Sequence, residues 1–387
     1  MQGDSMIIEV QGVNFINKGA ELMLHAVLQH YKNGENIVAA NLRCGNFKQR
    51  ADAGLYHIMW ADIVRAPITG PVLDSITRVV PKVLRQRLSL VRDSEVNAVL
   101  DASGFAFSDQ RGVNPSVNMA NRSQRWKSQG KKVVLLPQAF GPFEIKVIRD
   151  SVLRILDHAD LIFARDRISY DYLVDLAGIS DKIKLAPDFT NLVTGQIPPY
   201  WNPKSNAFCI IPNYRMIDKT TAEVRDSYLP FLETCIRYLL ERGIRPFILI
   251  HETKQDYQLA VELQKRLQQE LTVIQEENPL YVKGIIGSCS AVISSRFHGL
   301  VNALSQGVPS LATGWSHKYQ MLLDDYLCPD CFISNQDSRD EIVCKVAKLI
   351  DEPDRGQILS RLHQAGMNLK NETIKMWAEV DSVIGAN

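Results

Sequence analysis

The sequence predicts an α/β protein with two Rossmann-like domains that face a cleft, followed by a helical tail at the C-terminus. Three observations predict this class. Short runs of Val, Ile and Leu alternate with longer amphipathic segments, which is typical of β-α-β units and parallel sheets. The chain has 387 residues, which is longer than a chain that folds around a single hydrophobic core usually is. Finally, three prolines crowd residues 198–203, where they exclude a helix or a central strand and predict a linker.

The first domain is expected over residues 1–196. Its strands are predicted from short unbroken apolar runs, and its helices from apolar residues spaced three and four apart. Gly130 and Gly178 each follow one of these helices, at the position where a glycine commonly ends a helix. The predicted strands are 6–10, 36–41, 98–101, 132–137, 161–164 and 183–186, and the predicted helices are 20–31, 114–129, 143–156 and 168–177.

The second domain is expected over residues 204–356, and the helical tail over 357–387. Two such domains joined by a linker indicate a GT-B-like architecture, in which ligands bind at the carboxyl ends of parallel strands. Loops that follow strands are therefore the places to search for function. The predicted strands are 207–211, 246–251, 291–294 and 310–312, and the predicted helices are 228–242, 256–269, 300–306 and 357–384.

Charge and hydropathy exclude several classes of protein. Lys and Arg total 44 against 43 for Asp and Glu, so the chain lacks the basic excess that non-specific nucleic-acid binding requires. No apolar run approaches the roughly 20 residues that span a bilayer. The first apolar run, 6–10, is too short for a signal peptide, so we expect a cytoplasmic protein. The apolar and basic stretch 72–91 leaves open a flap, a contact with the inner face of the membrane, or a subunit interface, and the oligomeric state stays open too.

Cys328 and Cys331 have the C-x-x-C spacing of zinc and redox sites. A structural zinc site needs four ligands, and no second pair of this kind accompanies them. The surrounding sequence also lacks the context of a thioredoxin-like motif. We therefore expect an incidental pair in a polar loop, and no metal site.

The strongest motif is Ser294-Ser295-Arg296-Phe297-His298-Gly299, where a buried strand ends and a helix is expected to begin near Gly299. Ser295 can donate to an anion, and Arg296 offers a planar fork that suits a carboxylate or phosphate. His298 can exchange a proton near neutral pH, and Gly299 lets a ligand approach the backbone. The alternative is an ordinary turn with a surface arginine and a capping histidine. A charged and a titratable residue among small residues favour a functional site.

Five further residues lie in strand-to-helix loops. Lys318 could bind phosphate as a point charge or be a solvated lysine, and Arg215 is a second candidate anion clamp. Asp101, at a strand end, could act as a base or cap a turn. Asn14 and Glu21 lie in the first loop, where Glu21 could face the cleft or complement a helix dipole. That loop lacks the glycine patterns of dinucleotide and P-loop sites.

These motifs, taken together, resemble the polysaccharide pyruvyl transferase family. The most specific block is Ser295-Arg296-Phe297-His298-Gly299, followed by 307–309. One departure is Ala102-Ser103-Gly104, where members often carry a run of glycines. The matching segments occur in the family's order and are 12–21, 101–105, 138–143, 164–166 with Ser169, 187–188, 295–299 and 307–309.

The resemblance implies an enzyme that transfers pyruvate from phosphoenolpyruvate to two hydroxyls of a sugar, forming a ketal, with no metal or other cofactor. It implies Arg296 and Arg215 as contacts of the donor, His298 as general acid and Asp101 as general base. The acceptor would be a glycan, a nucleotide sugar or a lipid-linked repeat unit. Two alternatives stay open: a sugar-nucleotide glycosyltransferase on the same scaffold, and a catalytically silent protein that binds sugar or phosphate.

Overall fold

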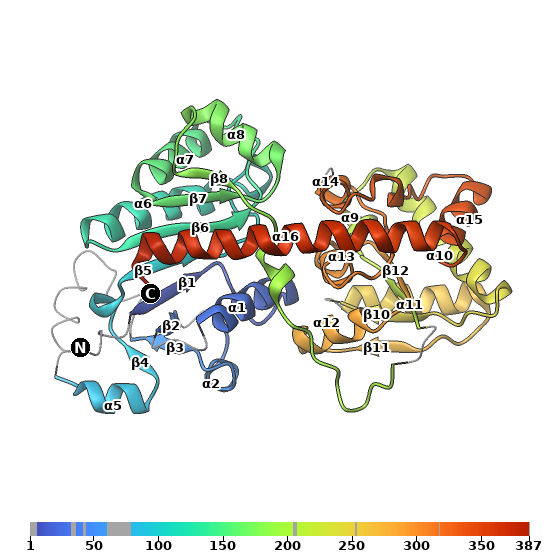
Figure 1. Ribbon diagram of the computed structural model, residues 1–387, viewed down its shortest axis with the longest axis horizontal. Helices are drawn as coiled ribbons and strands as arrows, with labels where there is room; N and C mark the ends of the chain where they lie inside the picture. The colour runs from blue at the N-terminus through green and yellow to red at the C-terminus, as the bar shows by residue number, and fades with distance from the viewer. Residues whose placement is uncertain are drawn as a thin grey trace. The chain divides into compact units, whose positions relative to one another are not determined.

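The computed structural model describes residues 6–31, 36–41, 44–59, 79–203, 207–251, 254–316 and 318–386. Two compact units make up the chain: Met1–Val193 together with Glu372–Asn387, and Thr194–Asn371. Each unit contains one sheet whose strand pairs are parallel, and Figure 1 shows helices beside both sheets. The predicted class, two parallel α/β units with a helical tail, is confirmed.

The sheet of the first unit has eight strands in the order β4-β3-β2-β1-β5-β6-β7-β8. Its central strands are buried on both faces, which explains why their sequences are unbroken apolar runs. Gln11 of β1 pairs with Asp101 of β5, so the loops that follow these two strands are neighbours. The strands are β1 Ile7–Gln11, β2 Ile37–Ala40, β3 Tyr56–Ile58, β4 Leu90–Val91, β5 Ala98–Asp101, β6 Lys132–Gln138, β7 Leu161–Ala164 and β8 Ile183–Leu185.

Helices cover this sheet, and polar side chains fix where several of them begin. Asn17 accepts a hydrogen bond from the Ala20 amide in the first turn of α1, and Asp166 accepts one from the Ser169 amide in α8. Trp126 of α6 is fully buried in the core. The helices are α1 Lys18–Tyr31, α2 Phe47–Asp52, α5 Lys82–Arg87, α6 Val113–Ser128, α7 Lys146–His158 and α8 Arg167–Ala177, with short 3-10 turns at Asp93–Glu95, Asp109–Arg111 and Phe189–Leu192.

The sheet of the second unit has five strands in the order β11-β10-β9-β12-β13. Ile211 of β9 pairs with Ser294 of β12, which sets the two loops that follow side by side. The strands are β9 Phe208–Ile211, β10 Phe247–Ile250, β11 Val273–Gln275, β12 Ala291–Ser294 and β13 Ser310–Ala312. The helices are α9 Arg215–Asp218, α10 Ala222–Glu241, α11 Lys254–Leu267, α12 Pro279–Gly287, α13 Phe297–Leu304, α14 Lys318–Asp325 and α15 Arg339–Lys348, with a 3-10 turn at Pro329–Cys331.

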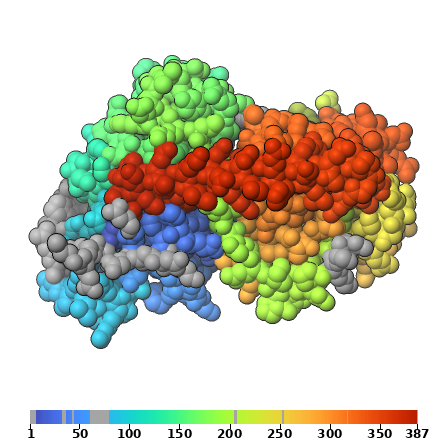
Figure 2. Space-filling model, in the orientation of Figure 1, coloured from blue at the N-terminus to red at the C-terminus, as the bar shows by residue number. Residues whose placement is uncertain are grey.

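The last helix, α16, spans Asp354–Ile384 and contributes residues to both units. Near its end, Asp381 accepts hydrogen bonds from Tyr31 at 3.0 Å and from His30 Nε2 at 2.9 Å, and Trp377 stacks on the His30 ring. Figure 2 shows one side of α16 open to the surface along its length, in agreement with the exposure of Met367. Among the described residues, no helix is long and apolar enough to cross a membrane.

Two sequence-based expectations need correction. The Cys328–Cys331 pair is not in a polar loop: both side chains are buried in the hydrophobic core of the second unit. The helix expected from residue 300 begins at Phe297, so Arg296 is its N-cap residue and His298 lies in its first turn. Of the stretch 72–91, residues 72–78 lie outside the described residues, and the remainder contains α5 and β4.

Candidate functional site

The motif predicted as strongest lies at the carboxyl edge of the second sheet. Because β9 and β12 are neighbouring parallel strands, the turn 213–215 and the turn 295–298 start from the same edge. Asn213 joins them directly: its Nδ2 donates to the Ser295 carbonyl oxygen at 2.8 Å. Its Oδ1 accepts from the Arg215 amide at 3.0 Å. One asparagine side chain therefore fixes both turns.

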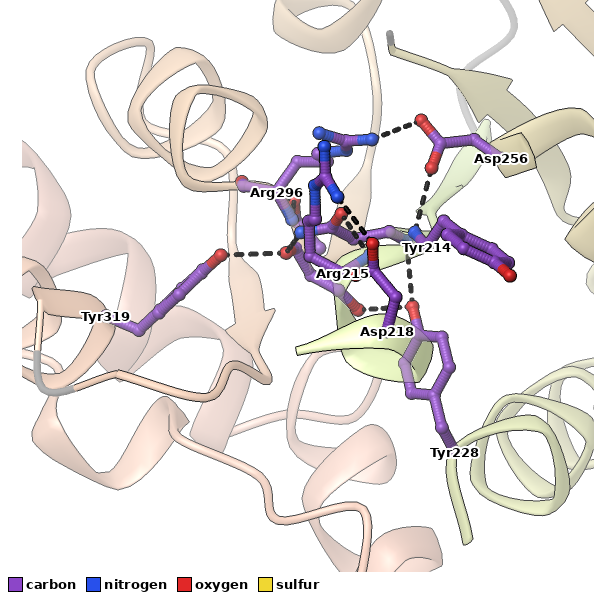
Figure 3. A network of polar contacts seen from close by, with 10 residues as sticks. Tyr214, Arg215, Asp218, Tyr228, Asp256, Arg296 and Tyr319 are labelled. Carbon is purple, nitrogen blue, oxygen red and sulfur yellow. Dashed lines mark hydrogen bonds and ion pairs between the residues drawn. The ribbon is translucent and has the colours of Figure 1, made fainter. Parts of the chain in front are cut away.

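Two buried tyrosines hold the turn at Ser295. Tyr228 donates to Ser295 Oγ at 2.8 Å and accepts from the Asn213 amide at 3.0 Å, and Tyr319 donates to the Ser295 carbonyl oxygen at 2.9 Å (Figure 3). Burial raises the pKa of Tyr228, and it raises the pKa of Tyr319 to about 12, so both phenols stay protonated donors at neutral pH. Ser295, predicted as a ligand contact, is fully buried here and serves the turn itself.

Arg296 is buried, which excludes the alternative of a surface arginine. Its guanidinium forms an ion pair with Asp256, which lies in the first turn of α11 and is fully buried. The other carboxylate oxygen of Asp256 accepts a hydrogen bond from the Tyr214 amide at 2.8 Å (Figure 3). Asp256 thus connects the Arg296 turn to the residue that precedes Arg215.

Arg215, predicted as a second anion clamp, belongs to the same network but is far more exposed. Its guanidinium pairs with Asp218 one turn along α9, with side-chain exposures of 47% and 29%. A solvated pair of this kind is worth about 0–1 kcal/mol. Arg215 can therefore leave Asp218 for an anionic ligand at little cost.

His298, Gly299 and Lys318 complete the predicted set in this unit. The His298 ring lies edge-on to Phe297, with centroids 5.6 Å apart. Lys318 Nζ lies over three aromatic rings, those of Phe297, Trp315 and Tyr319, at 5.2, 5.5 and 5.6 Å. A cation against ring faces gains stability without losing its charge.

Gly299 has an internal role that the sequence did not indicate. A Cβ atom there would lie 2.9 Å from Ser294 Oγ and 3.1 Å from Ile211 Cδ1. Close packing of α13 on the sheet thus already requires a glycine at this position. The expected approach of a ligand to its backbone stays a prediction.

In the first unit, Asp101 lies at the carboxyl end of β5 and is buried. Its oxygens accept hydrogen bonds from Ser103 Oγ at 2.7 Å and from Gln138 Nε2 at 2.9 Å. Burial raises the pKa of Asp101, although these two donors and the charge of Arg122 act in the opposite direction. A carboxylate with a raised pKa is a better proton acceptor than an exposed one.

Asn14 and Glu21 lie beside this loop, on the chain that leaves β1. Asn14 Oδ1 accepts from the amides of Ile16 at 3.0 Å and Asn17 at 2.8 Å, so this side chain shapes the turn. Glu21 is in the first turn of α1, 4.0 Å from His25 Nε2. Burial raises the pKa of Glu21 to about 7, against the opposing charge of Lys18. Glu21 can therefore exchange a proton near neutral pH.

The predicted residues thus form two groups. Arg215, Ser295, Arg296, His298 and Lys318 come from loops and helix starts of the second unit, whereas Asn14, Glu21 and Asp101 come from the first. Sequence reasoning missed Asp256, Tyr228, Tyr319 and Gln138 as parts of these groups. The only signal for Asp256 was a carboxylate shortly after a strand, a pattern too common to single it out.

Comparison with known proteins gives one family and one fold. The family model of polysaccharide pyruvyl transferases matches residues 17–317. Among solved structures, a glycosyltransferase from Rickettsia africae aligns with TM-score 0.61 at 12% identity, covering 99% of this chain and 100% of that one. A putative UDP-N-acetylglucosamine 2-epimerase from Listeria monocytogenes aligns with TM-score 0.61 at 11% identity, covering 99% and 98%. The Anabaena protein HepE, solved with UDP and glucose, aligns with TM-score 0.55 at 11% identity, covering 99% and 100%. At such identities the likeness shows the GT-B-type fold alone.

Proposed function

This chain belongs to the polysaccharide pyruvyl transferase family, and from that premise we propose that it transfers pyruvate from phosphoenolpyruvate to two hydroxyls of one sugar. The product is a pyruvate ketal, and inorganic phosphate is released. The acceptor is a sugar of a surface glycan or of its precursor: a free chain, a nucleotide sugar or a lipid-linked repeat unit. We place the reaction in the cytoplasm, with its lipid-linked form at the inner face of the membrane.

One observation carries this proposal: Arg215 and Arg296 belong to a single hydrogen-bonded network at the carboxyl edge of the second sheet. Phosphoenolpyruvate has two anionic groups, a carboxylate and a phosphate, and each suits the fork of a guanidinium. Lys318 adds a third positive charge from the first residue of α14. This clustering supports a donor with more than one anionic group.

The residues then take the following roles in the proposed reaction. His298 donates a proton to the methylene carbon of phosphoenolpyruvate, which leaves the adjacent carbon electrophilic. A sugar hydroxyl attacks that carbon, and Asp101 accepts the proton it loses. The second hydroxyl attacks the same carbon as the carbon–oxygen bond to phosphate breaks. The positive charges of Arg296 and Arg215 stabilise the departing phosphate, which takes up the proton that the second hydroxyl loses.

The proposal is tested by incubating the protein with phosphoenolpyruvate and a panel of glycosides, nucleotide sugars and lipid-linked sugars. Release of phosphate that depends on the acceptor, with a mass gain of one pyruvyl group on that acceptor, is the expected result. Neither a metal nor a nicotinamide is required, so a chelator should leave the rate unchanged.

The same experiment separates the alternatives. Some proteins of this fold have been solved with UDP bound, among them Staphylococcus aureus MnaA and Anabaena HepE. Transfer from a UDP-sugar together with inertness toward phosphoenolpyruvate would select the glycosyltransferase. Binding of sugar or phosphate without turnover of any donor would select the silent binding protein.

A further inference from the structure

We propose that Asp256 is a positioning residue of the donor site. It fixes Arg296 in the orientation that binds the anionic donor, and the ion pair between the two side chains is kept when the donor binds. The inference rests on the proposed function, since it assigns to Asp256 a role in phosphoenolpyruvate binding. Asp256 is not part of the motif that contains Arg296: it lies 40 residues before Arg296 in the sequence.

The ion pair of Asp256 with Arg296 is buried. The side chain of Asp256 is fully buried and that of Arg296 is 10% exposed. Separating such a pair would leave a charge in a poorly solvated environment without its counter-ion, which is far more costly than separating two exposed charges. The pair therefore stays intact when a ligand arrives.

The two carboxylate oxygens of Asp256 have different partners. One oxygen contacts Arg296 Nη2, and the other accepts from the Tyr214 amide at 2.8 Å (Figure 3). A carboxylate whose two oxygens are both engaged is restricted in its rotation, and its contact with Nη2 restrains that end of the guanidinium. Arg296 has further N–H donors in its rigid fork, which a ligand can contact without displacing Asp256.

Asp218 is more exposed than Asp256. Both carboxylates pair with an arginine of the same network, but the pair of Arg215 with Asp218 is largely solvated. Asp218 therefore competes with an anionic donor for Arg215, whereas Asp256 prepares Arg296 for it. Removing the two negative charges should have opposite effects on donor affinity.

Calorimetric titration of the full chain with phosphoenolpyruvate tests this inference. Asp256→Asn is expected to weaken binding at least tenfold, and Asp218→Asn to leave it unchanged or to tighten it by a few-fold. Glu262→Gln, which removes an exposed carboxylate paired with Arg266 on the same helix as Asp256, is the control and should bind as wild type does. If simple charge repulsion governed the site, Asp256→Asn would tighten binding, and this result would overturn the inference.

A kinetic cycle separates positioning from a general loss of structure. Arg296→Lys and Asp256→Asn should each raise the KM for phosphoenolpyruvate while leaving the KM for the acceptor unchanged. The KM of the double variant for phosphoenolpyruvate should be no higher than that of the single variant with the higher KM, because the two side chains act as one unit. Additive losses, or equal changes in both KM values, would contradict a positioning role.

Three further outcomes are decisive. If Asp256→Asn does not fold, Asp256→Glu replaces it, because this change keeps the charge but displaces it by one methylene. Folded Asp256→Glu should bind phosphoenolpyruvate several-fold more weakly than wild type does, and wild-type affinity would overturn the inference. Wild-type protein that binds no phosphoenolpyruvate would overturn the proposed function and this inference with it. Wild-type protein that binds it while Asp256→Asn binds equally well would overturn this inference alone.

Discussion

Replacing Arg296 by Ala should destabilise the second unit as well as weaken donor binding. The change removes the counter-ion of Asp256, whose side chain is fully buried. A buried carboxylate that loses its counter-ion keeps a charge that its surroundings solvate poorly, which destabilises the fold.

The magnitude follows from that burial. Removing one partner of a buried pair typically costs about 3–5 kcal/mol. The second unit spans Thr194–Asn371, and in a unit of that size each kcal/mol lowers the unfolding midpoint by roughly 2–4 °C. Arg296→Ala should therefore lower the midpoint of the second unit by roughly 6–20 °C.

Scanning calorimetry of the full chain, combined with hydrogen exchange of peptides from β9 and β12, measures this effect. Arg266→Ala is the matched control: Arg266 pairs with Glu262 at 3.3 Å, but both side chains are about two-fifths exposed. Its loss should cost less than about 1 kcal/mol. A midpoint for Arg296→Ala no lower than that of Arg266→Ala would refute the reasoning.

Three other predictions concern single residues. His298→Ala should lower kcat at least a hundred-fold while changing the KM for phosphoenolpyruvate less than three-fold, because a general acid acts on the transition state. Steady-state kinetics measures both constants, and a near wild-type kcat would remove His298 from the mechanism. Gly12→Ala should destabilise the first unit and reduce activity, since its Cβ would lie 2.3 Å from Ser103 Oγ, in the loop of Asp101. Gly54→Ala, at a similar φ of 70° with no atom within 4 Å of its Cβ, is the control, and equal thermal shifts would show that the contact with Ser103 is unimportant. Glu21→Gln should stabilise the protein increasingly as the pH rises from about 4.5 to about 7. The pKa of Glu21 is about 7 in the folded state and 4.5 in the unfolded state, so ionisation of Glu21 destabilises the wild-type fold over this range, and glutamine does not ionise. Urea unfolding across this range measures the difference between variant and wild type, and a difference that does not change with pH would contradict the raised pKa.

The sequence predicted the strands that form apolar runs, including β8 and β13 at sheet edges, and it missed the short strands β3, β4 and β11. Strands 98–101, 161–164, 291–294 and 310–312 have the predicted bounds, because a strand buried on both faces appears directly as an apolar run. β4 and β11 lie at sheet edges, have two and three residues, and are only partly buried. Such short, half-exposed strands leave no periodic pattern that a single sequence could show.

The candidate site was predicted as a set of loops but not as a network. Arg296 stands out because its turn contains a charged and a titratable residue among small ones. Its partner Asp256 does not stand out, because packing of α11 brings together residues that are far apart in the chain. The roles of Tyr228 and Tyr319 are hidden for the same reason, since each looks like an ordinary core aromatic until its hydroxyl finds Ser295. Gly299 was singled out for the approach of a ligand, which stays a prediction, and the structure gives packing against Ser294 as a separate reason for a glycine there.

The central claim is that this chain consumes phosphoenolpyruvate to form a ketal on a sugar. The most direct measurement follows phosphate release from phosphoenolpyruvate in the presence of each acceptor, with mass analysis of the product. We predict that phosphate and the pyruvylated sugar appear in equal amounts, and that both fall together, sharply in Arg296→Lys and at least a hundred-fold in His298→Ala. Release of phosphate without any gain of a pyruvyl group, or the absence of release with every class of acceptor, would contradict the account.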